Sequence, residues 1–191
     1  MSNVNNVTTG KPKIGGAIFR APVGTTLPKD AKATLDPAFK GLGYVSDDGV
    51  TNSDAPDTDK VKAWGGDTVH VTNNGRDDTF KMTFIEALNV EVLKTVYGDK
   101  NVSGDLATGI TVKANSDDPD PYTYVIDMIL QNNTLKRTVI PNGTVTDIGD
   151  IKYTDGDLVG YETTISASPD DDGNTHYDYI IGTATAKGDA E

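Results

Sequence analysis

The sequence contains no cysteine, which removes disulfide bonds, thiolate metal sites and thiol nucleophiles together. It has only two histidines, His70 and His176, roughly a hundred positions apart and without zinc-ligand spacing. Nucleophile-elbow, phosphate-loop and dinucleotide-binding motifs are missing as well. We therefore expect no catalytic residues, no cofactor and no dedicated metal centre.

Long apolar runs are also missing, and the polar start MSNVNNVTTG lacks the apolar core of a secretory signal. We expect the protein to stay in the cytoplasm without membrane contact. Aromatic residues make up only 7% of the chain, with a single tryptophan, Trp64, beside Gly65 and Gly66. Because sugar sites usually carry several aromatic platforms, Trp64 is expected to be a core or interface anchor.

Positive charge is scarce and uneven. The net charge of −12 argues against a nucleic-acid reader, since phosphate affinity comes from Lys and Arg. Residues 1–40 nevertheless hold six Lys/Arg against two Asp, a net of +4, which leaves −16 for the other 151 residues. A basic arm on an acidic body is complementary between copies, although a solvated tail fits the same numbers.

The clearest pattern lies in residues 79–98, TFKMTFIEALNVEVLKTVYG. Its first part alternates apolar and polar residues as a half-buried strand does, and residues 89–97 follow a helical stripe. Asn89 fits an N-cap and Gly98 a left-handed stop. The sequence predicts a strand that runs directly into a short helix, with no loop between them.

Elsewhere, short apolar segments alternate with turn residues. Residues 122–131 form the clearest strand; their second face is half apolar, so we expect a helix, a loop or a neighbouring subunit to cover it. Asn132 and Asn133 predict a turn, followed by strands at 135–140 and 144–148 that a turn at 141–143 separates. Asp47, Asp48 and Gly49 predict a hairpin turn, residues 53–59 an exposed acidic loop, residues 60–64 and 67–72 two strands on either side of Gly65 and Gly66, and residues 73–75 another turn.

These patterns predict an all-β fold, a β-sandwich or open barrel, with one short helix near 89–97. A chain of this length is most simply one domain, residues 1–191. We divide it into an N-terminal arm at 1–13, a core at 14–181 and a C-terminal arm at 182–191. Both arms are poor in apolar residues, so we expect them to be mobile in a monomer and ordered in an assembly.

Aspartate-rich runs allow a second interpretation. They occur at 47–48, 54–59, 117–120 and 170–172, and each could offer oxygens to calcium, although none has EF-hand spacing. Asp in turns also caps its own backbone without an ion. A calcium- or carbohydrate-binding β-sandwich module is therefore the alternative function.

Four segments carry a resemblance to a known family. They are GKPKIGG at 10–16, FKGLGYVSDDGV at 39–50, VKAWGGD at 61–67 and the strand–helix unit at 79–98. In this order they resemble the tail tube, or major tail, proteins of long non-contractile-tailed bacteriophages, over roughly residues 11–179. The resemblance implies a two-sheet β-sandwich with one flanking helix, in rings, conventionally hexameric, that stack into a hollow tube for DNA ejection.

The resemblance also implies a location, partners and contacts. The protein would be a virion tail component assembled in the bacterial host cytoplasm, with copies of itself and with tape measure, tail terminator and distal tail proteins as partners. DNA would pass the lumen without specific binding. Contacts between subunits are expected at the N-terminal arm, the 46–59 loop, the helix and the C-terminal tail, with these candidate residues: Lys11, Lys13, Asp47, Asp48, Trp64, Leu93 and Tyr97.

An acidic lumen would repel DNA phosphates and keep the wall from binding the genome. Candidate lumen acids are outward-facing residues opposite an apolar face of their strand. The sequence offers four of them: Asp127, Asp147, Glu162 and Asp178.

Overall fold

The computed structural model of the chain describes residues 2–13 and 16–182. Within these ranges α1 (Val90–Tyr97) is the only α-helix, and the predicted all-β fold with one short helix is confirmed. The strands are β1 (Lys11–Pro12), β2 (Ile18–Pro22), β3 (Lys40–Gly41), β4 (Val45–Lys62), β5 (Thr68–Phe84), β6 (Val102–Ser103), β7 (Thr111–Val112), β8 (Tyr122–Ile129), β9 (Leu135–Ile148), β10 (Tyr161–Ser168) and β11 (Tyr177–Ile181). Single 3-10 turns are η1 (Val4–Asn6), η2 (Asp99–Asn101) and η3 (Gln131–Asn133).

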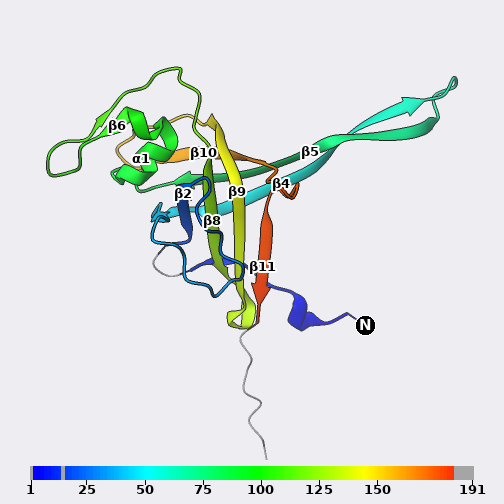
Figure 1. Ribbon diagram of the computed structural model, residues 1–191, viewed down its shortest axis with the longest axis horizontal. Helices are drawn as coiled ribbons and strands as arrows, with labels where there is room; N and C mark the ends of the chain where they lie inside the picture. Colours follow the sequence, from blue (N-terminus) through cyan, green and yellow to red (C-terminus); the bar gives the residue numbers. More distant parts are fainter. Residues whose placement is uncertain (1, 14–15, 183–191) are drawn as a thin grey trace, which may run out of the picture.

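One sheet with the order β3-β2-β8-β9-β10-β5-β4 organises the molecule, with β1 beside β8 and β11 beside β9. All pairings are antiparallel. β9 pairs with β8 along one edge, while its other edge pairs first with β11 and then with β10. The sheet therefore has two halves that share β9, and β10, β5 and β4 run across the direction of β8, β9 and β11 (Figure 1).

β9 is one continuous strand, so the two strands predicted at 135–140 and 144–148 are wrong as separate elements. Pro141, Asn142 and Gly143 form no loop but mark the point where β9 changes from β11 to β10. The register against β8 shifts there, and Pro141 offers its carbonyl to Thr123 Oγ1 at 2.8 Å. Proline and glycine are compatible with a strand at such an irregularity.

Gly143 lies where the two halves of the sheet meet, opposite Tyr122 of β8 and Ala167 of β10. A Cβ atom at this position would lie 2.7 Å from the Tyr124 ring and 2.8 Å from Ile165 Cγ2, and both side chains are fully buried. We expect Gly143→Ala to lower the free energy of unfolding by about 1–3 kcal/mol through overpacking. Urea denaturation measures this change. Gly156→Ala, where a Cβ meets nothing within 4 Å, is the control and should change it by less than about 0.5 kcal/mol; equal values for both variants would contradict the prediction.

The main core lies between the two halves of the sheet and the apolar face of α1. Its largest buried members come from both halves and from the helix: Ile18, Leu42, Phe80, Met82, Phe84, Val92, Leu93, Val96, Tyr124, Ile126, Ile140, Tyr161 and Ile165. Alternate residues of β5 and β10 supply this face, as period-two patterning requires.

A second, smaller core covers the other face of β2, β8 and β9. Ala21, Phe39, Val125 and Val139 form its centre, and the connection between β2 and β3 packs over them. The expectation that a helix, a loop or a neighbour covers the second face of β8 is therefore confirmed, with a loop as the cover.

α1 begins and ends as its caps predict. Asn89 accepts a hydrogen bond from the Glu91 backbone N–H at 3.0 Å, and the Gly98 N–H donates to the Lys94 carbonyl at 2.8 Å with a positive φ. The prediction of a strand running directly into the helix is wrong, because residues 85–89 separate β5 from α1. A turn is needed there, since the helix must leave the plane of the sheet before its apolar face can pack on the core.

β4 and β5 form one long hairpin, so the predicted loop at 53–59 is wrong. Cross-strand polar pairs replace the apolar contacts that a sequence pattern can detect: Arg76 pairs with Asp54, and Asn74 Nδ2 donates to Asp59 at 2.8 Å. The turns predicted at 47–49 and 73–75 are irregularities within the hairpin, where its register shifts, and Gly49 and Gly75 have positive φ there. The true turn lies at 63–67, around Gly65 and Gly66.

The N-terminal arm is partly attached to its own subunit. β1 pairs with the end of β8, and Lys13 Nζ lies 3.4 Å from Asp127 Oδ2. The division into one domain with two arms stays a prediction, as does their ordering on assembly. Most of the predicted C-terminal arm, residues 183–191, lies outside the described residues.

Candidate assembly surfaces

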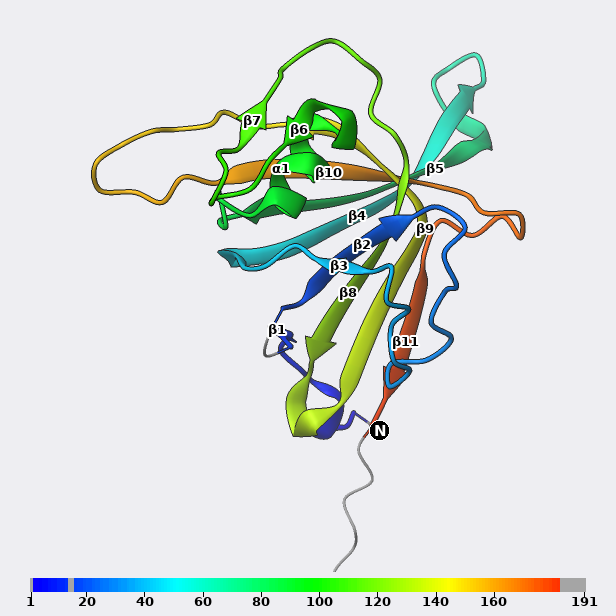
Figure 2. The ribbon, with the colours of Figure 1, turned by 60° about the vertical axis from the view of Figure 1, so that its left-hand side comes forward.

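The outer part of the β4–β5 hairpin leaves the body of the molecule as a two-stranded ribbon (Figures 1 and 2). Every residue from 55 to 77 is exposed, on both faces of the ribbon. A two-stranded hairpin alone is marginally stable in water. This ribbon is therefore a large surface that its own chain leaves uncovered.

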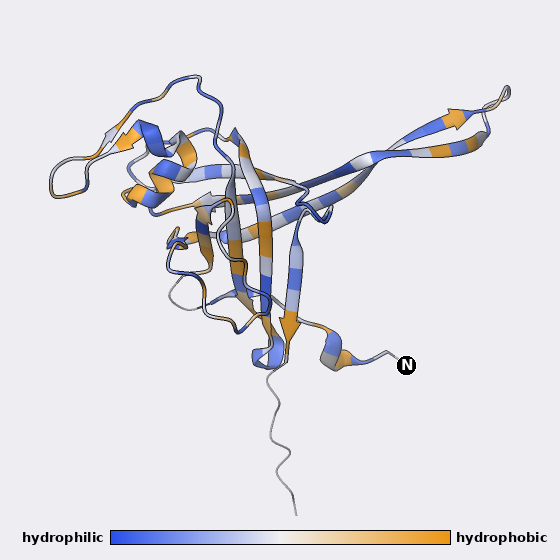
Figure 3. Ribbon diagram, viewed as in Figure 1, coloured by the Kyte–Doolittle hydropathy of each residue, from blue (hydrophilic) through white to orange (hydrophobic). Residues whose placement is uncertain are grey.

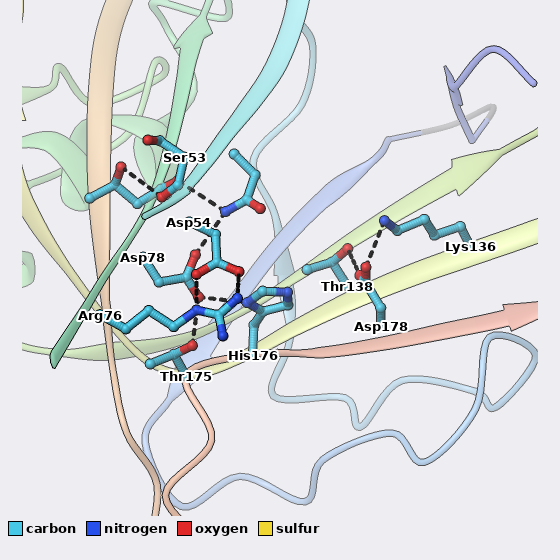
Figure 4. A network of polar contacts seen from close by, with 11 residues as sticks. Ser53, Asp54, Arg76, Asp78, Lys136, Thr138, Thr175, His176 and Asp178 are labelled. Atoms are coloured by element: carbon cyan, nitrogen blue, oxygen red, sulfur yellow. Dashed lines mark hydrogen bonds and ion pairs between the residues drawn. The ribbon is translucent and has the colours of Figure 1, made fainter. Parts of the chain in front are cut away.

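The ribbon is fixed to the body at Asp78, whose side chain is fully buried. Asp78 Oδ1 accepts a hydrogen bond from Asn52 Nδ2 at 2.8 Å. Its Oδ2 accepts one from Thr175 Oγ1 at 2.6 Å and lies 2.5 Å from His176 Nδ1 (Figure 4). Thr175 and His176 precede β11, so these bonds join the root of the ribbon to the other half of the sheet. A buried carboxylate satisfied in this way can hold an element in one orientation.

Just outside this root, the Arg76 guanidinium pairs with both carboxylate oxygens of Asp54 (Figure 4). The hydrogen bond from Arg76 lowers the pKa of Asp54, which keeps the carboxylate ionised. The pair connects β4 to β5 where the ribbon leaves the core.

The far end of the ribbon includes hydrophobic segments, orange in Figure 3, and four of its apolar residues are exposed. We call Val61, Trp64, Val69 and Val71 the tip surface. Trp64 lies wholly in solvent, so a role as a core anchor is wrong, while a role as an interface anchor stays a prediction.

Four of the predicted contact residues lie around one hollow. Lys11, Lys13, Asp47 and Asp48 line a space of about 510 Å³ between the N-terminal arm and the irregular start of β4. Ile126 and Met128 of β8 are also part of its lining. The structure therefore brings these residues together within one subunit, and their part in subunit contacts stays a prediction.

The two predicted contact residues of α1 are not freely exposed. Leu93 is buried in the main core, so its role as a direct contact is wrong. Tyr97 is half-buried and packs edge-on against Tyr161, with ring centroids 6.1 Å apart. The helix is held by Arg20, which donates to Glu91 at 3.1 Å and to Asp99 at 2.7 Å. Burial alone would raise the pKa of Glu91, but hydrogen bonds from Lys94 and Arg20 outweigh it and lower that pKa.

Asp127 does not face outward, so the premise that made it a lumen candidate is wrong. Its side chain is 5% exposed, and Arg137 Nε and Nη2 donate to its two oxygens at 2.6 and 2.8 Å. Arg137 Nη1 also donates to the carbonyls of Asp30 and Ala33 in the connection above the second core. This pair is an internal support of the subunit.

The other three acids lie near the surface on two different parts of the sheet. Asp178 Oδ2 pairs with Lys136 at 2.7 Å, and its Oδ1 accepts a hydrogen bond from Thr138 at 2.5 Å. Glu162 pairs with Lys81 at 2.8 Å, and Asp147 lies opposite Thr164 in register. Their place in a lumen stays a prediction.

Asp147 and Glu162 belong to a polar face of β9, β10 and β5 on the side away from the main core. Cross-strand partners project to the same side of a sheet. The register places threonine, serine, lysine and the two acids together there: Thr79, Lys81, Thr83, Asp147, Glu162, Thr164 and Ser166. Short hydroxyls with a few charges make this face flat and hydrophilic.

Two features of the described residues bear on other functions. Within residues 2–13 and 16–182, no group of three or more His, Cys, Asp or Glu side chains is placed to hold a metal ion. Across the same ranges, the chain forms no helix of the length and apolarity that a membrane span requires.

Comparison with known proteins identifies the family of the chain. A family model described as phage tail tube protein matches residues 3–189. The chain belongs to this family. None of the curated proteins compared with the chain matches it. This tail tube protein is therefore a structural component of the virion tail, in a family whose members form a tube.

Sequence reasoning missed several residues that shape these surfaces. Arg137 could have been found, since the turn at Asn132 and Asn133 places it opposite Asp127 in the β8–β9 register. No pattern in the sequence connects Asp78 with its partners, because Thr175 and His176 lie almost a hundred positions away.

Proposed function

We propose that this tail tube protein assembles into stacked rings that form the hollow tube through which DNA is ejected. The rings are hexameric, as the resemblance to the family implies. It acts by geometry and electrostatics and catalyses no reaction. The observation that carries the proposal is the ribbon, where residues 55–77 are exposed on both faces. A ribbon of this length is stabilised when another subunit covers its exposed faces.

The proposed partners are copies of the same chain, with tape measure, terminator and distal tail proteins completing the tail. Assembly takes place in the bacterial host cytoplasm, and DNA passes without specific binding. The acidic body supports this last point, because its net charge of −16 over residues 41–191 repels phosphates.

Negative-stain electron microscopy of the purified protein tests the proposal. We expect rings or rods with a central hole, formed at high protein concentration. A protein that stays monomeric in every condition, and that calcium stabilises against thermal unfolding, would favour the calcium-binding alternative instead.

The polar face of β9, β10 and β5 is the proposed lumen wall. Asp147 and Glu162 outnumber Lys81 on this face, so repeating it around a ring builds a band of net negative charge, which costs assembly stability until salt screens it over about 8–10 Å. We expect rod formation, measured by sedimentation, to increase with moderate salt. Phage carrying Asp147→Lys and Glu162→Lys should assemble tails yet eject DNA poorly. Asp155→Lys with Asp171→Lys, in exposed loops, is the control; normal ejection by the first pair would refute the lumen assignment.

A further inference from the structure

A second exposed apolar surface lies at the other end of the molecule. Leu88, Leu106 and Leu158 are 66, 67 and 76% exposed. They surround a shallow hollow of about 510 Å³ that Ile85, Ala87 and Val159 also line. We call these three leucines the leucine surface. Soluble monomers rarely expose such clusters, which mark contact sites.

Three segments distant in the sequence build this surface. Leu88 belongs to the turn before α1, Leu106 to the loop between β6 and β7, and Leu158 to the loop between β9 and β10. In both ribbon views these segments lie around α1, while the tip of the β4–β5 ribbon points away on the opposite side (Figures 1 and 2). A subunit therefore cannot cover its own leucine surface with its own tip.

The tip surface matches the leucine surface in chemistry. Val61, Val69 and Val71 are 50, 62 and 52% exposed, and Trp64 is completely so. Val71 shares one face of the ribbon with Lys60, its cross-strand partner, whereas Val61 shares the opposite face with His70.

Charge on one face of the tip is complementary to charge at the leucine surface. Lys60 lies on the Val71 face of the tip and Lys62 next to the turn, while the exposed Asp59 lies on the opposite face of the ribbon and Asp67 in the turn itself. Asp105 and Asp157 directly precede Leu106 and Leu158, and both acids are exposed, as are the two lysines. Opposite charges around an apolar centre orient two partners and favour this pairing over tip–tip contact through the Val71 face, which would bring lysines together.

The other hollows fit the tip less well. The one beneath the C-terminal end of α1 is lined by several aspartates, but Val96 and Val145 are already buried in the subunit's own core, and Ile148, its third large aliphatic side chain, is only 38% exposed. Docking there would remove little apolar surface from water. The hollow at the N-terminal arm has two lysines and two aspartates in its lining, which offers no net attraction to lysines.

We infer that the tip surface of one subunit docks on the leucine surface of a second copy. The inference rests on the proposed self-assembly and names its contact. The two surfaces are different, so the contact is heterologous, and repeating it builds a closed ring or an open helical stack. It has Trp64 as its aromatic anchor and the leucines as its receiving pocket.

The absence of cysteine allows a direct test, since any introduced thiol is the only one in its chain. Ala63→Cys and Ala107→Cys place thiols beside the two surfaces and leave Trp64 and the leucines unchanged. The two variants are mixed before assembly, with a size tag on one, and treated with a short bismaleimide. We expect a cross-linked heterodimer in the mixture, at several times the yield of either variant alone. Ala63→Cys mixed with Thr34→Cys, an exposed site elsewhere, is the matched control.

The outcomes separate this inference from the proposed function. Rods or rings in the microscope without the tip–leucine cross-link would overturn the inference and leave tube assembly standing. Cross-linking of Ala63→Cys with itself at the mixture's yield would show tip–tip pairing and also overturn it. Absence of any assembly by the unmodified protein would overturn both. As a second readout, Leu158→Ser should abolish rod formation, whereas Tyr153→Ser, exposed in the same loop, should not.

Discussion

Replacing Asp127 by alanine is expected to lower the free energy of unfolding by about 3–5 kcal/mol. The replacement leaves the Arg137 guanidinium, 2% exposed, without its carboxylate partner. An unpaired buried charge is among the costliest defects in a folded protein, far above the loss of a surface pair. The midpoint temperature of thermal unfolding should fall by an amount on the order of 10 °C, because each kcal/mol corresponds to about 2–4 °C for a chain of this size.

Two further variants test the cause of this loss. Asp178→Ala removes an acid whose partner Lys136 is 27% exposed, so we expect a cost of less than about 1 kcal/mol. Adding Arg137→Met to Asp127→Ala removes the unpaired charge and should restore part of the stability. Recovery should be incomplete, because the carbonyls of Asp30 and Ala33 lose their donor. Equal losses for Asp127→Ala and Asp178→Ala would contradict a buried, structural pair.

Because Asp127 is buried, it cannot be used to test whether the lumen wall repels DNA. Charge reversal at Asp127 would disrupt the subunit before any effect on DNA could be measured. Asp147 and Glu162 lie on the polar face of the sheet with exposed or half-exposed side chains, so reversing them should cost far less than reversing Asp127, and the largest part of that cost is the lost Glu162–Lys81 pair.

Sequence patterns correctly predicted the elements that are fixed by residues close together in the sequence. The helix has a cap at Asn89, a stop at Gly98 and one apolar stripe, and all of these act within a few residues. The strand at Tyr122–Ile129 carries its period-two pattern into a buried, central position, and Asn132 and Asn133 turn the chain through positive φ angles. These features depend on side-chain chemistry that a sequence displays directly.

Strands were expected at the outer end of the ribbon, at 60–64 and 67–72, but the continuity of the ribbon with the core escaped prediction because that pairing depends on residues typical of loops. Asp54, Asp59 and Asn74 are typical turn formers, yet each is paired across the hairpin. Period-two apolar patterning requires a buried face, and a ribbon exposed on both faces has none within its own subunit. The site was hidden for the same reason, since the two apolar surfaces are assembled from segments that only the fold brings together.

Shortening the ribbon is expected to abolish assembly and leave the subunit folded. Residues 56–76 would be replaced by Asn-Gly, which joins Ala55 to Asp77, a cross-strand pair in the native register. The deletion removes the whole tip surface but keeps Asp78 with Asn52, Thr175 and His176, so the root of the hairpin stays attached.

Two measurements check this expectation. The midpoint of thermal unfolding should move by no more than about 2–4 °C, the equivalent of 1 kcal/mol, because residues 55–77 bury nothing in the core. Rods and rings should be absent at every protein concentration at which the unmodified chain forms them. A shortened protein that still forms rods would contradict any role for the ribbon in assembly.

A point variant separates the length of the ribbon from its apolar chemistry. Val69→Thr with Val71→Thr keeps β-branched residues, so the strand conformation is retained, while two members of the tip surface become polar. If apolar contact drives docking, this variant should weaken rod formation almost as much as the deletion does, with unchanged circular dichroism. If it assembles normally while the deletion does not, the ribbon acts through Trp64, its backbone or its polar pairs, and docking through Val69 and Val71 is excluded.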